Sequence, residues 1–273
     1  MTGVVDLKVK SSDFMMRNWL AMGSVMTLAS SAVGGLASPA IAEPAHTAPP
    51  GLVDLIDTLE QAANAQDLAA VLALYSPDFR HADGFDRNSY EAALVSLWAD
   101  YSQLTYDVEL LEWDSDGANR LVTETLTQIS GTRFDEGREF TLVAQIQSRQ
   151  YIESGQIVYQ EISTEQTRLV AGTNPPTVVL HIPEQVGPGE RFSFDAIVQE
   201  PLGNQRLLGR VIDEGVTADD FTVPRPIDLE PLAAGGLFKI GNAPTNPDQR
   251  WISSVLIRSD GWVIDTRRLN VTN

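Results

Sequence analysis

The sequence contains no cysteine and few basic residues for its length. Without cysteine the chain forms no disulfide, no thiolate metal site and no cysteine nucleophile. Its 273 residues include 19 lysines and arginines against 37 acidic residues, a formal net charge of −18. Phosphate binding requires clustered basic side chains that displace counterions, so this charge argues against a nucleic-acid partner. Because the acidic residues are scattered rather than arranged in blocks, we expect a solvated acidic surface.

Histidine and the common catalytic motifs are also scarce. The only histidines are His46, His81 and His181, which lie in distant parts of the chain. There is no glycine-rich phosphate loop, no nucleophile elbow and no Ser-His-Asp order. Residues 114–119 contain acids and a glycine, but they lack the spacing of an EF-hand loop and are expected to form a hairpin turn. The sequence therefore predicts neither a metal site nor a cofactor.

The first 42 residues have the pattern of an export signal. Arg17 precedes 25 residues without charge, and this stretch ends in the small-x-small tripeptide at 40–42 that signal peptidase recognises. We expect cleavage before Glu43 and delivery to the periplasm or outside the cell, with no membrane contact afterwards. A start at Met15 or Met16 would give a signal of ordinary length. The alternative is an uncleaved anchor, since 25 uncharged residues could cross a bilayer.

The next part of the chain reads as helices followed by strands. After a proline-rich tail at 43–50, apolar residues recur with helical spacing at 52–63, at 68–75 and at 90–101. Asp67 is the expected N-cap of the second helix, and Asn88 with Glu91 forms the expected capping pair of the third. From residue 104 the period changes to two, which predicts strands near 104–114, 120–130, 139–151 and 156–168. This order indicates an α+β domain at 51–170.

A short motif relates this domain to a known family. The segment LYSPDFRHADG, from Leu74 to Gly84, is followed by the helix that ends at Tyr101 and then by the strands. This arrangement resembles the nuclear transport factor 2-like superfamily, which includes SnoaL-like and ketosteroid isomerase-like proteins. The resemblance implies a cone, in which three helices lie on a curved antiparallel sheet. It also implies pocket carboxylates and tyrosines in the enzymes, and dimers that pair through the outer face of the sheet.

The remaining third of the chain predicts a second domain. Residues 171–176 are small or polar and end in two prolines, which is typical of a linker. Beyond them the helical period disappears, and strands are expected near 177–182, 190–199, 206–212, 251–258 and 262–271, with turns at glycines. Short strands with regular turns over 177–273 predict an all-β, immunoglobulin-like sandwich.

His81 and Asp83 form the one local pair with catalytic character. Residues two apart in an extended segment share a face, and a histidine oriented by a carboxylate is a common general base. The simpler alternative is that Asp83 and Gly84 form the turn into the third helix.

The last hairpin of the first domain gives a sharper prediction. If Ser154 and Gly155 form a two-residue loop, Ser148 pairs with Glu161. The face of residues 140, 142, 144 and 146 is expected to point inward, so Tyr159, Glu161 and Ser163 would line the cone. The candidate pocket therefore consists of seven residues: His81, Asp83, Tyr101, Ser148, Tyr159, Glu161 and Ser163. The alternative places Glu161 and Glu165 in solvent at the rim.

Two functions follow from these expectations. The first is an exported, non-catalytic binding or scaffold protein whose cone holds a small apolar ligand, or which pairs through the outer face of its sheet. The second is a cofactor-independent isomerase, dehydratase or cyclase that uses Glu161, or His81 with Asp83, as general acid and base. A cone filled by Trp98, Tyr101, Leu142 and Ile146 would favour the first function.

Overall fold

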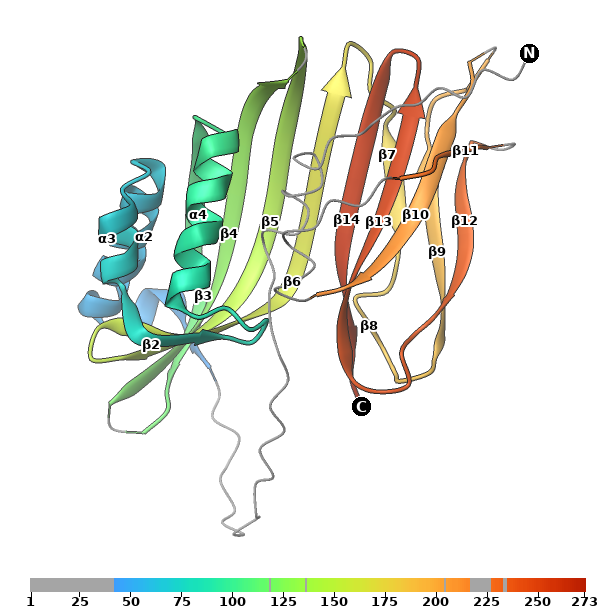
Figure 1. Ribbon diagram of the computed structural model, residues 1–273. Coiled ribbons are helices and arrows are strands. Elements are labelled where there is room, and N and C mark those ends of the chain that lie inside the picture. The colour runs from blue at the N-terminus through green and yellow to red at the C-terminus, as the bar shows by residue number, and fades with distance from the viewer. Residues whose placement is uncertain (1–41, 118, 136, 204, 217–226, 233–234) are drawn as a thin grey trace. The chain divides into compact units, whose positions relative to one another are not determined.

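The computed structural model describes residues 42–117, 119–135, 137–203, 205–216, 227–232 and 235–273. The predicted signal, except Ala42, lies outside the described residues. Among those described, no helix is long and apolar enough to cross a membrane. The chain divides into two compact units (Figure 1), and we describe each by itself. The first contains residues 42–131 and 144–165, and the second contains residues 132–143 and 166–273.

The three predicted helices are present. They are α2 (Pro50–Asn64), α3 (Leu68–Ala73) and α4 (Arg87–Asp100). Asp67 caps α3 as expected, because its carboxylate accepts a hydrogen bond from the backbone N–H of Ala70 at 3.0 Å. The expected cap of α4 was wrong. Asp86 is the N-cap, and Ser89 completes a reciprocal capping box with it, so the helix begins one residue before Asn88.

The helices precede a four-stranded antiparallel meander (Figure 1). Its strands are β3 (Leu104–Ser115), β4 (Arg120–Asp135), β5 (Arg138–Glu153) and β6 (Gln156–Gly172). Before α2, β1 (Glu43–Pro44) pairs with β3, and a short 3-10 helix, η1 (Ala45–Thr47), follows it. The α+β order agrees with the sequence, although β4 and β6 extend several residues beyond their expected ends.

Side chains fasten the helices to the sheet. Asn64, at the end of α2, both donates to and accepts from the backbone of Tyr106 in β3, with both distances 2.8 Å. Glu60, one turn earlier, accepts from the backbone N–H of Val108 at 2.9 Å. In α4, the indole N–H of Trp98 donates to the hydroxyl of Tyr106 at 3.0 Å. The helices α2 and α4 are therefore held to the sheet by hydrogen bonds as well as by apolar contact.

The motif segment forms a strand that the sequence did not predict. This strand, β2 (Tyr75–His81), runs parallel to the start of β6, with a register shift between Tyr75 and Arg80. Its inward side chains join an aromatic cluster, in which the hydroxyls of Tyr75 and Tyr90 lie 3.0 Å apart and Phe79 packs edge-on against Tyr75. Because prolines are confined to strand edges and bulges, Pro77 obscured the strand in the sequence.

The second unit contains two sheets around one apolar core. One sheet has the order β6-β14-β13-β10-β11, with β8 parallel to β14, and the other has the order β12-β9-β7. Their bounds are β7 (Val178–His181), β8 (Gln185–Val186), β9 (Arg191–Val198), β10 (Leu208–Gly215), β11 (Glu230–Pro231), β12 (Gly236–Asn242), β13 (Asp248–Arg258) and β14 (Gly261–Val271). Phe194 and Ala196 of β9 meet Ile252 and Leu256 of β13 in the core. The strands β8, β11 and β12 were not expected.

Residues 166–172 of β6 belong to this second unit. They pair antiparallel with residues 261–267 of β14. At this junction Arg168 makes two hydrogen bonds to the fully buried carboxylate of Asp265, at 2.8 and 3.0 Å, and a third to the carbonyl of Val178. The hydrogen bonds to Asp265 raise the pKa of Arg168, while partial burial opposes this shift. These seven residues are therefore an integral part of the second unit.

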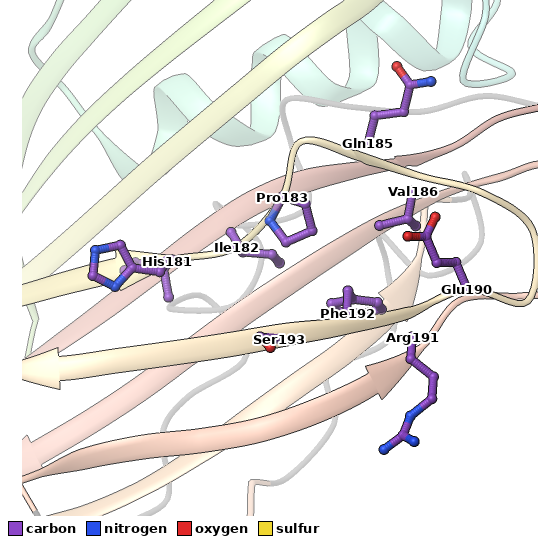
Figure 2. Close-up of a pocket in the computed structure, with 10 residues that line it drawn as sticks. His181, Ile182, Pro183, Gln185, Val186, Glu190, Arg191, Phe192 and Ser193 are labelled. Atoms are coloured by element: carbon purple, nitrogen blue, oxygen red, sulfur yellow. The ribbon is translucent and has the colours of Figure 1, made fainter.

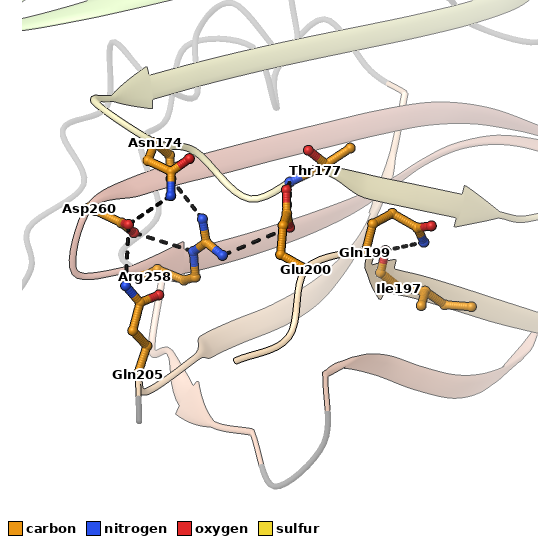
Figure 3. Close-up of polar contacts among 8 residues, drawn as sticks. All are labelled: Asn174, Thr177, Ile197, Gln199, Glu200, Gln205, Arg258 and Asp260. Carbon is orange, nitrogen blue, oxygen red and sulfur yellow. Dashed lines mark hydrogen bonds and ion pairs between the residues drawn. The ribbon is translucent and has the colours of Figure 1, made fainter. Parts of the chain in front are cut away.

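The segment after β6 is fixed by a polar network (Figure 3). The buried guanidinium of Arg258 lies 3.3 Å from a carboxylate oxygen of Asp260 and donates to the carbonyl of Asn174 at 2.9 Å. The amide of Asn174 donates to Asp260 at 3.0 Å, and Glu200 accepts from the backbone N–H of Thr177. These hydrogen bonds lower the pKa of both Glu200 and Asp260. The expected linker is thus held against the β13–β14 turn.

Candidate functional site

The pairing of β2 with β6 gathers most of the predicted site residues in the first unit. His81 lies opposite Gln160, and the backbone N–H of Ala82 donates to the carbonyl of Gln160 at 2.7 Å. This contact places the turn that contains Asp83 beside Tyr159 and Glu161, whose pKa values respond to the charge of Asp83. The sequence could not show this proximity, because the parallel pairing joins segments almost 80 residues apart.

The contacts of His81 fit the turn alternative. Its Nδ1 atom accepts a hydrogen bond from the backbone N–H of Asp83 at 3.1 Å, while the Asp83 carboxylate oxygen lies 3.9 Å from the same atom. Both side chains are buried, and the imidazole packs edge-on against Phe85. Since Nδ1 already accepts from the main chain, Asp83 orients the histidine through its backbone rather than through its carboxylate.

Glu161 lies in an ionic cluster that includes a residue the sequence analysis missed. Arg149 lies 3.8 Å from Glu161 and 2.8 Å from Glu124, a largely buried glutamate on β4. The hydroxyl of Ser163 donates to the other oxygen of Glu124 at 3.4 Å. The structure shows that Glu124 and the threonines on either side of it are buried, and a carboxylate in such a place needs a partner; the sequence alone does not show this burial.

The surroundings of Glu161 raise its pKa above the ordinary glutamate value. Burial raises the pKa of Glu161, Arg149 opposes this shift, and the charges of Glu124 and Asp83 add to it. Burial also raises the pKa of the Tyr159 hydroxyl, and the charge of Glu161 contributes. The Glu161 side chain keeps 38% of its surface exposed, so this carboxyl remains accessible to solvent. The Glu161 carboxyl can therefore exchange protons with solvent at the protein surface.

The hairpin prediction was right for the loop, but the structure places the side chains differently. Ser154 and Gly155 join β5 to β6 with positive φ angles of 51° and 76°, as a two-residue turn requires. The buried side of β5 holds Phe140, Leu142, Ala144, Ile146, Ser148, Gln150 and Ile152, which confirms the expected inward face.

Glu161 contacts Arg149, on the opposite side of β5 from Ser148. Similarly, the ring of Tyr159 lies 5.5 Å from that of Tyr151, and the side-chain amide of Gln160 donates to the hydroxyl of Ser148 at 3.5 Å. The buried residues of β6 are odd-numbered at Ile157, even-numbered at Ile162 and odd-numbered again from Glu165, so the regular alternation is interrupted between these positions. Tyr159, Glu161 and Ser163 therefore lie on the face of Arg149.

Tyr101 is buried at the C-terminal end of α4. Its backbone N–H donates to the carbonyl of Leu97, and its own carbonyl accepts from the side-chain amide of Gln66 at 3.1 Å. These contacts fix the end of the helix, so Tyr101 has a packing role in the described structure.

An apolar pocket lies at the hairpin end of the first unit, where the sequence analysis placed no site. Its volume is about 260 Å³, and Leu52 and Leu55 of α2 face Leu121 and Ile152 of the sheet across it. The other lining residues are Pro49, Gly51, Asn119, Ser154 and Gly155. No lining side chain is titratable. The pocket therefore fits an apolar group, with Asn119 as the main polar contact.

The described residues contain no group of three or more histidine, aspartate or glutamate side chains that could hold a metal ion. The ionic cluster has two glutamates and a nearby aspartate, but Arg149 lies between the glutamates and contacts both. What the cluster can do chemically is to hold a positive group or to exchange a proton at Glu161.

Comparison with known proteins gives one family match and several distant structural matches. The family model matches residues 173–272 and is described as a domain of unknown function (DUF8623). No curated protein matches the chain.

The solved structures cover about two fifths of the chain. They include a putative scytalone dehydratase from Novosphingobium aromaticivorans, with 13% identity and a TM-score of 0.36 over 43% of this chain and 83% of that one. A Delta 5-3-ketosteroid isomerase from a Mycobacterium species has 13% identity and a TM-score of 0.28, over 41% of this chain and 91% of that one. An LEH-like epoxide hydrolase from Mycobacterium tuberculosis has 14% identity and a TM-score of 0.28, over 41% and 80%. These values leave the function to be argued from the site.

Proposed function

We propose that the protein is an exported binding or scaffold protein without catalytic activity. In this proposal a nuclear transport factor 2-like cone is followed by an immunoglobulin-like sandwich. The observation that carries the proposal is the separation of the apolar interior from the carboxylates. The inward face of β5 carries buried apolar side chains such as Leu142 and Ile146, and Tyr101 is fully buried, while Glu161 lies on the opposite face beside Arg149.

The strand order supports the sandwich assignment. The chain alternates between the two sheets so that β7, β9 and β12 form one sheet, while β10, β11, β13 and β14 form the other. The short strand β8 crosses to the second sheet and runs parallel to the last strand, β14. A first strand that is split between two sheets in this way is compatible with immunoglobulin-like topology.

Export is supported by the sequence of the first 42 residues. The uncharged stretch and the Ala40-Ile41-Ala42 site would direct the chain through the secretory route, and cleavage would leave Glu43 at the new amino terminus. The absence of cysteine from the whole chain makes the fold independent of the oxidising environment outside the cytoplasm.

The ligand of this binding protein would be small and apolar, and it would occupy the pocket between α2 and the sheet. Leu121 is only partly buried there, so a larger side chain can fill the space without disturbing the core. We expect the protein purified from its own envelope to retain such a ligand in native mass spectrometry. The variant Leu121→Trp should lose the ligand, whereas Val95→Trp, on an exposed position of α4, should keep it.

If the wild-type protein carries no bound mass, the proposed ligand is contradicted. It is also contradicted if the Leu121→Trp variant still carries the bound mass. The same measurement reports a homodimer. Pairing through the outer sheet face would involve the half-exposed Arg149, so Arg149→Glu should dissociate such a dimer.

The alternative is a cofactor-independent isomerase, dehydratase or cyclase. The raised pKa of Glu161 favours it, since a shift in this direction brings a carboxyl closer to the range in which it can act as a general acid. An enzyme of this kind would lose turnover in Glu161→Gln while Glu109→Gln, at an exposed position of β3, kept it.

A further inference from the structure

The edge of β9 that faces β7 is paired over only half of its length. The register runs from Val178 opposite Val198 to His181 opposite Asp195, and no strand of the described residues pairs with this edge at residues 191–194. On its other edge β9 pairs with β12 over residues 191–197. One end of the strand is therefore half open.

The hydrogen bonds show which backbone groups are left at this open edge. The N–H of Ala243 donates to the carbonyl of Glu190, and the N–H of Val198 donates to that of Gly235, so the even-numbered residues of β9 face β12. Because antiparallel pairing alternates along a strand, the odd-numbered residues face β7. The N–H and C=O groups of Arg191 and Ser193 therefore point to the line of β7 beyond its end.

Proline explains why β7 stops there. If the register continued, Pro183 would stand opposite Ser193, and proline has no N–H to donate. The chain instead crosses to the other sheet, where Gln185 and Val186 form β8 beside β14. The carbonyl of Glu184 accepts from the N–H of Asn270 at 2.9 Å, which fixes this crossing.

A groove of about 490 Å³ occupies the place that β7 leaves (Figure 2). Phe192 and Val186, both buried, contribute to its apolar floor, and Leu180 and Ile182 are the other apolar lining residues. His181, Pro183, Gln185, Glu190, Arg191 and Ser193 complete the lining. Glu190 is already engaged, since its carboxylate accepts from the N–H of Gly187 at 2.7 Å.

We propose that this groove binds an extended peptide segment of a partner protein by strand addition. The peptide would continue the line of β7, antiparallel to β9, and pair with the backbone of Arg191 and Ser193. An apolar side chain of the peptide would rest on Phe192 and Val186, and its neighbours in sequence would point outward. The exposed guanidinium of Arg191 favours an acidic residue at the rim. The inference is independent of the ligand proposed for the first unit.

The backbone groups of Arg191 and Ser193 that meet no strand among the described residues are the reason for a peptide rather than a small apolar molecule. Backbone donors and acceptors in strand geometry at the edge of a sheet are a template for another main chain. An apolar ligand would use the floor of the groove and leave these four groups in water. A peptide can place an apolar side chain on the floor of the groove and also form hydrogen bonds with the backbone of Arg191 and Ser193.

The test uses a random 12-residue peptide library displayed on phage and panned against the full-length mature chain. Ser193→Pro removes the N–H that faces the groove and leaves the β12 ladder intact, since Phe192 and Phe194 donate there. Ser193→Thr is the matched control, because it keeps the N–H. We expect selected peptides to bind Ser193→Pro about tenfold more weakly, as the loss of one backbone hydrogen bond implies, and to bind Ser193→Thr like wild type.

Amide hydrogen exchange in the wild-type protein gives a second, independent readout. A bound peptide should slow exchange at Arg191 and Ser193, whose amides on this edge pair with no strand in the part of the chain that the structure describes. The proposal is overturned if panning enriches no peptide, or if enriched peptides leave these two amides unchanged. It is also overturned if the edge pairs with a second copy, seen as a dimer that Ser193→Pro dissociates.

Discussion

At the scale of single residues, Glu161 carries a proton-linked contribution to stability. Its folded-state pKa is raised, so the folded state binds a proton more tightly than the unfolded state. The charged form is the disfavoured one, and the destabilisation therefore appears as pH rises from the ordinary glutamate value through the raised value. Below that interval the protonated group causes no such loss.

The variant Glu161→Gln should reveal this effect. We expect the melting temperature of the wild type to fall relative to that of Glu161→Gln between pH 4 and pH 8, because the glutamine never ionises. The exposed Glu109→Gln is the control and should follow the wild type. A difference that stays constant with pH, measured by differential scanning calorimetry, would rule out this linkage.

Arg168 and Asp265 form the most consequential ion pair of the second unit. The carboxylate of Asp265 is fully buried, and its remaining cationic neighbour, Arg267, lies 3.7 Å away. Arg168→Ala would leave this buried charge poorly compensated, which should cost about 2–4 kcal/mol. Chemical denaturation would measure the loss. The double variant Arg168→Met with Asp265→Leu should recover most of it, since removal of both charges leaves no unpaired group.

At the scale of elements, the junction of β6 with β14 depends on two glycines. A β-carbon on Gly172 would lie 2.6 Å from the carbonyl oxygen of Asp260, and one on Gly261 would lie 2.5 Å from the Cα of Pro175. Both contacts are with the main chain, so neither can relax by side-chain rotation. Gly172 also has a φ angle of 100°, which is unfavourable for other residues.

The variant Gly172→Ala should therefore be more destabilising than Gly155→Ala. Gly155 also has a positive φ angle, 76°, but a β-carbon there meets nothing within 4 Å. We expect a loss of about 1 kcal/mol for Gly155→Ala, from the backbone angle alone. The loss for Gly172→Ala should be about 2–4 kcal/mol, because steric overlap adds to the angle. Equal losses in urea denaturation would refute the steric argument.

The sequence predicted elements with a strong local signal. The periodic helices, the hairpin at Ser154 and Gly155 and the cap at Asp67 follow from neighbouring residues, and all three are present. The strand β2 is held by a distant partner in β6 and contains Pro77, so local patterns did not reveal it. The face of Glu161 depends on a change of parity within β6, which alternation alone does not show.

At the scale of the whole molecule, the boundary found by sequence comparison differs from the boundary of the compact unit. The family model begins at residue 173, whereas the second unit includes β6 from Gln166 onward. These seven residues supply Leu169 and Ala171, both buried, and Arg168, the partner of Asp265. A fragment cut at the family boundary would thus lose the strand that pairs with β14 and leave that edge of β14 without a partner.

Two fragments test this difference, one of residues 166–273 and one of residues 173–273. Both lack residues 132–143, so they differ only in the strand. We expect thermal unfolding followed by circular dichroism to give the shorter fragment a melting temperature about 10 °C lower or more, since β6 contributes several kcal/mol to a domain of this size. The variant Asp265→Asn should raise the stability of the shorter fragment, where the carboxylate lacks Arg168, and lower that of the longer one. Equal melting temperatures would show that the second unit folds without β6, and the family boundary would then be the correct limit of the domain.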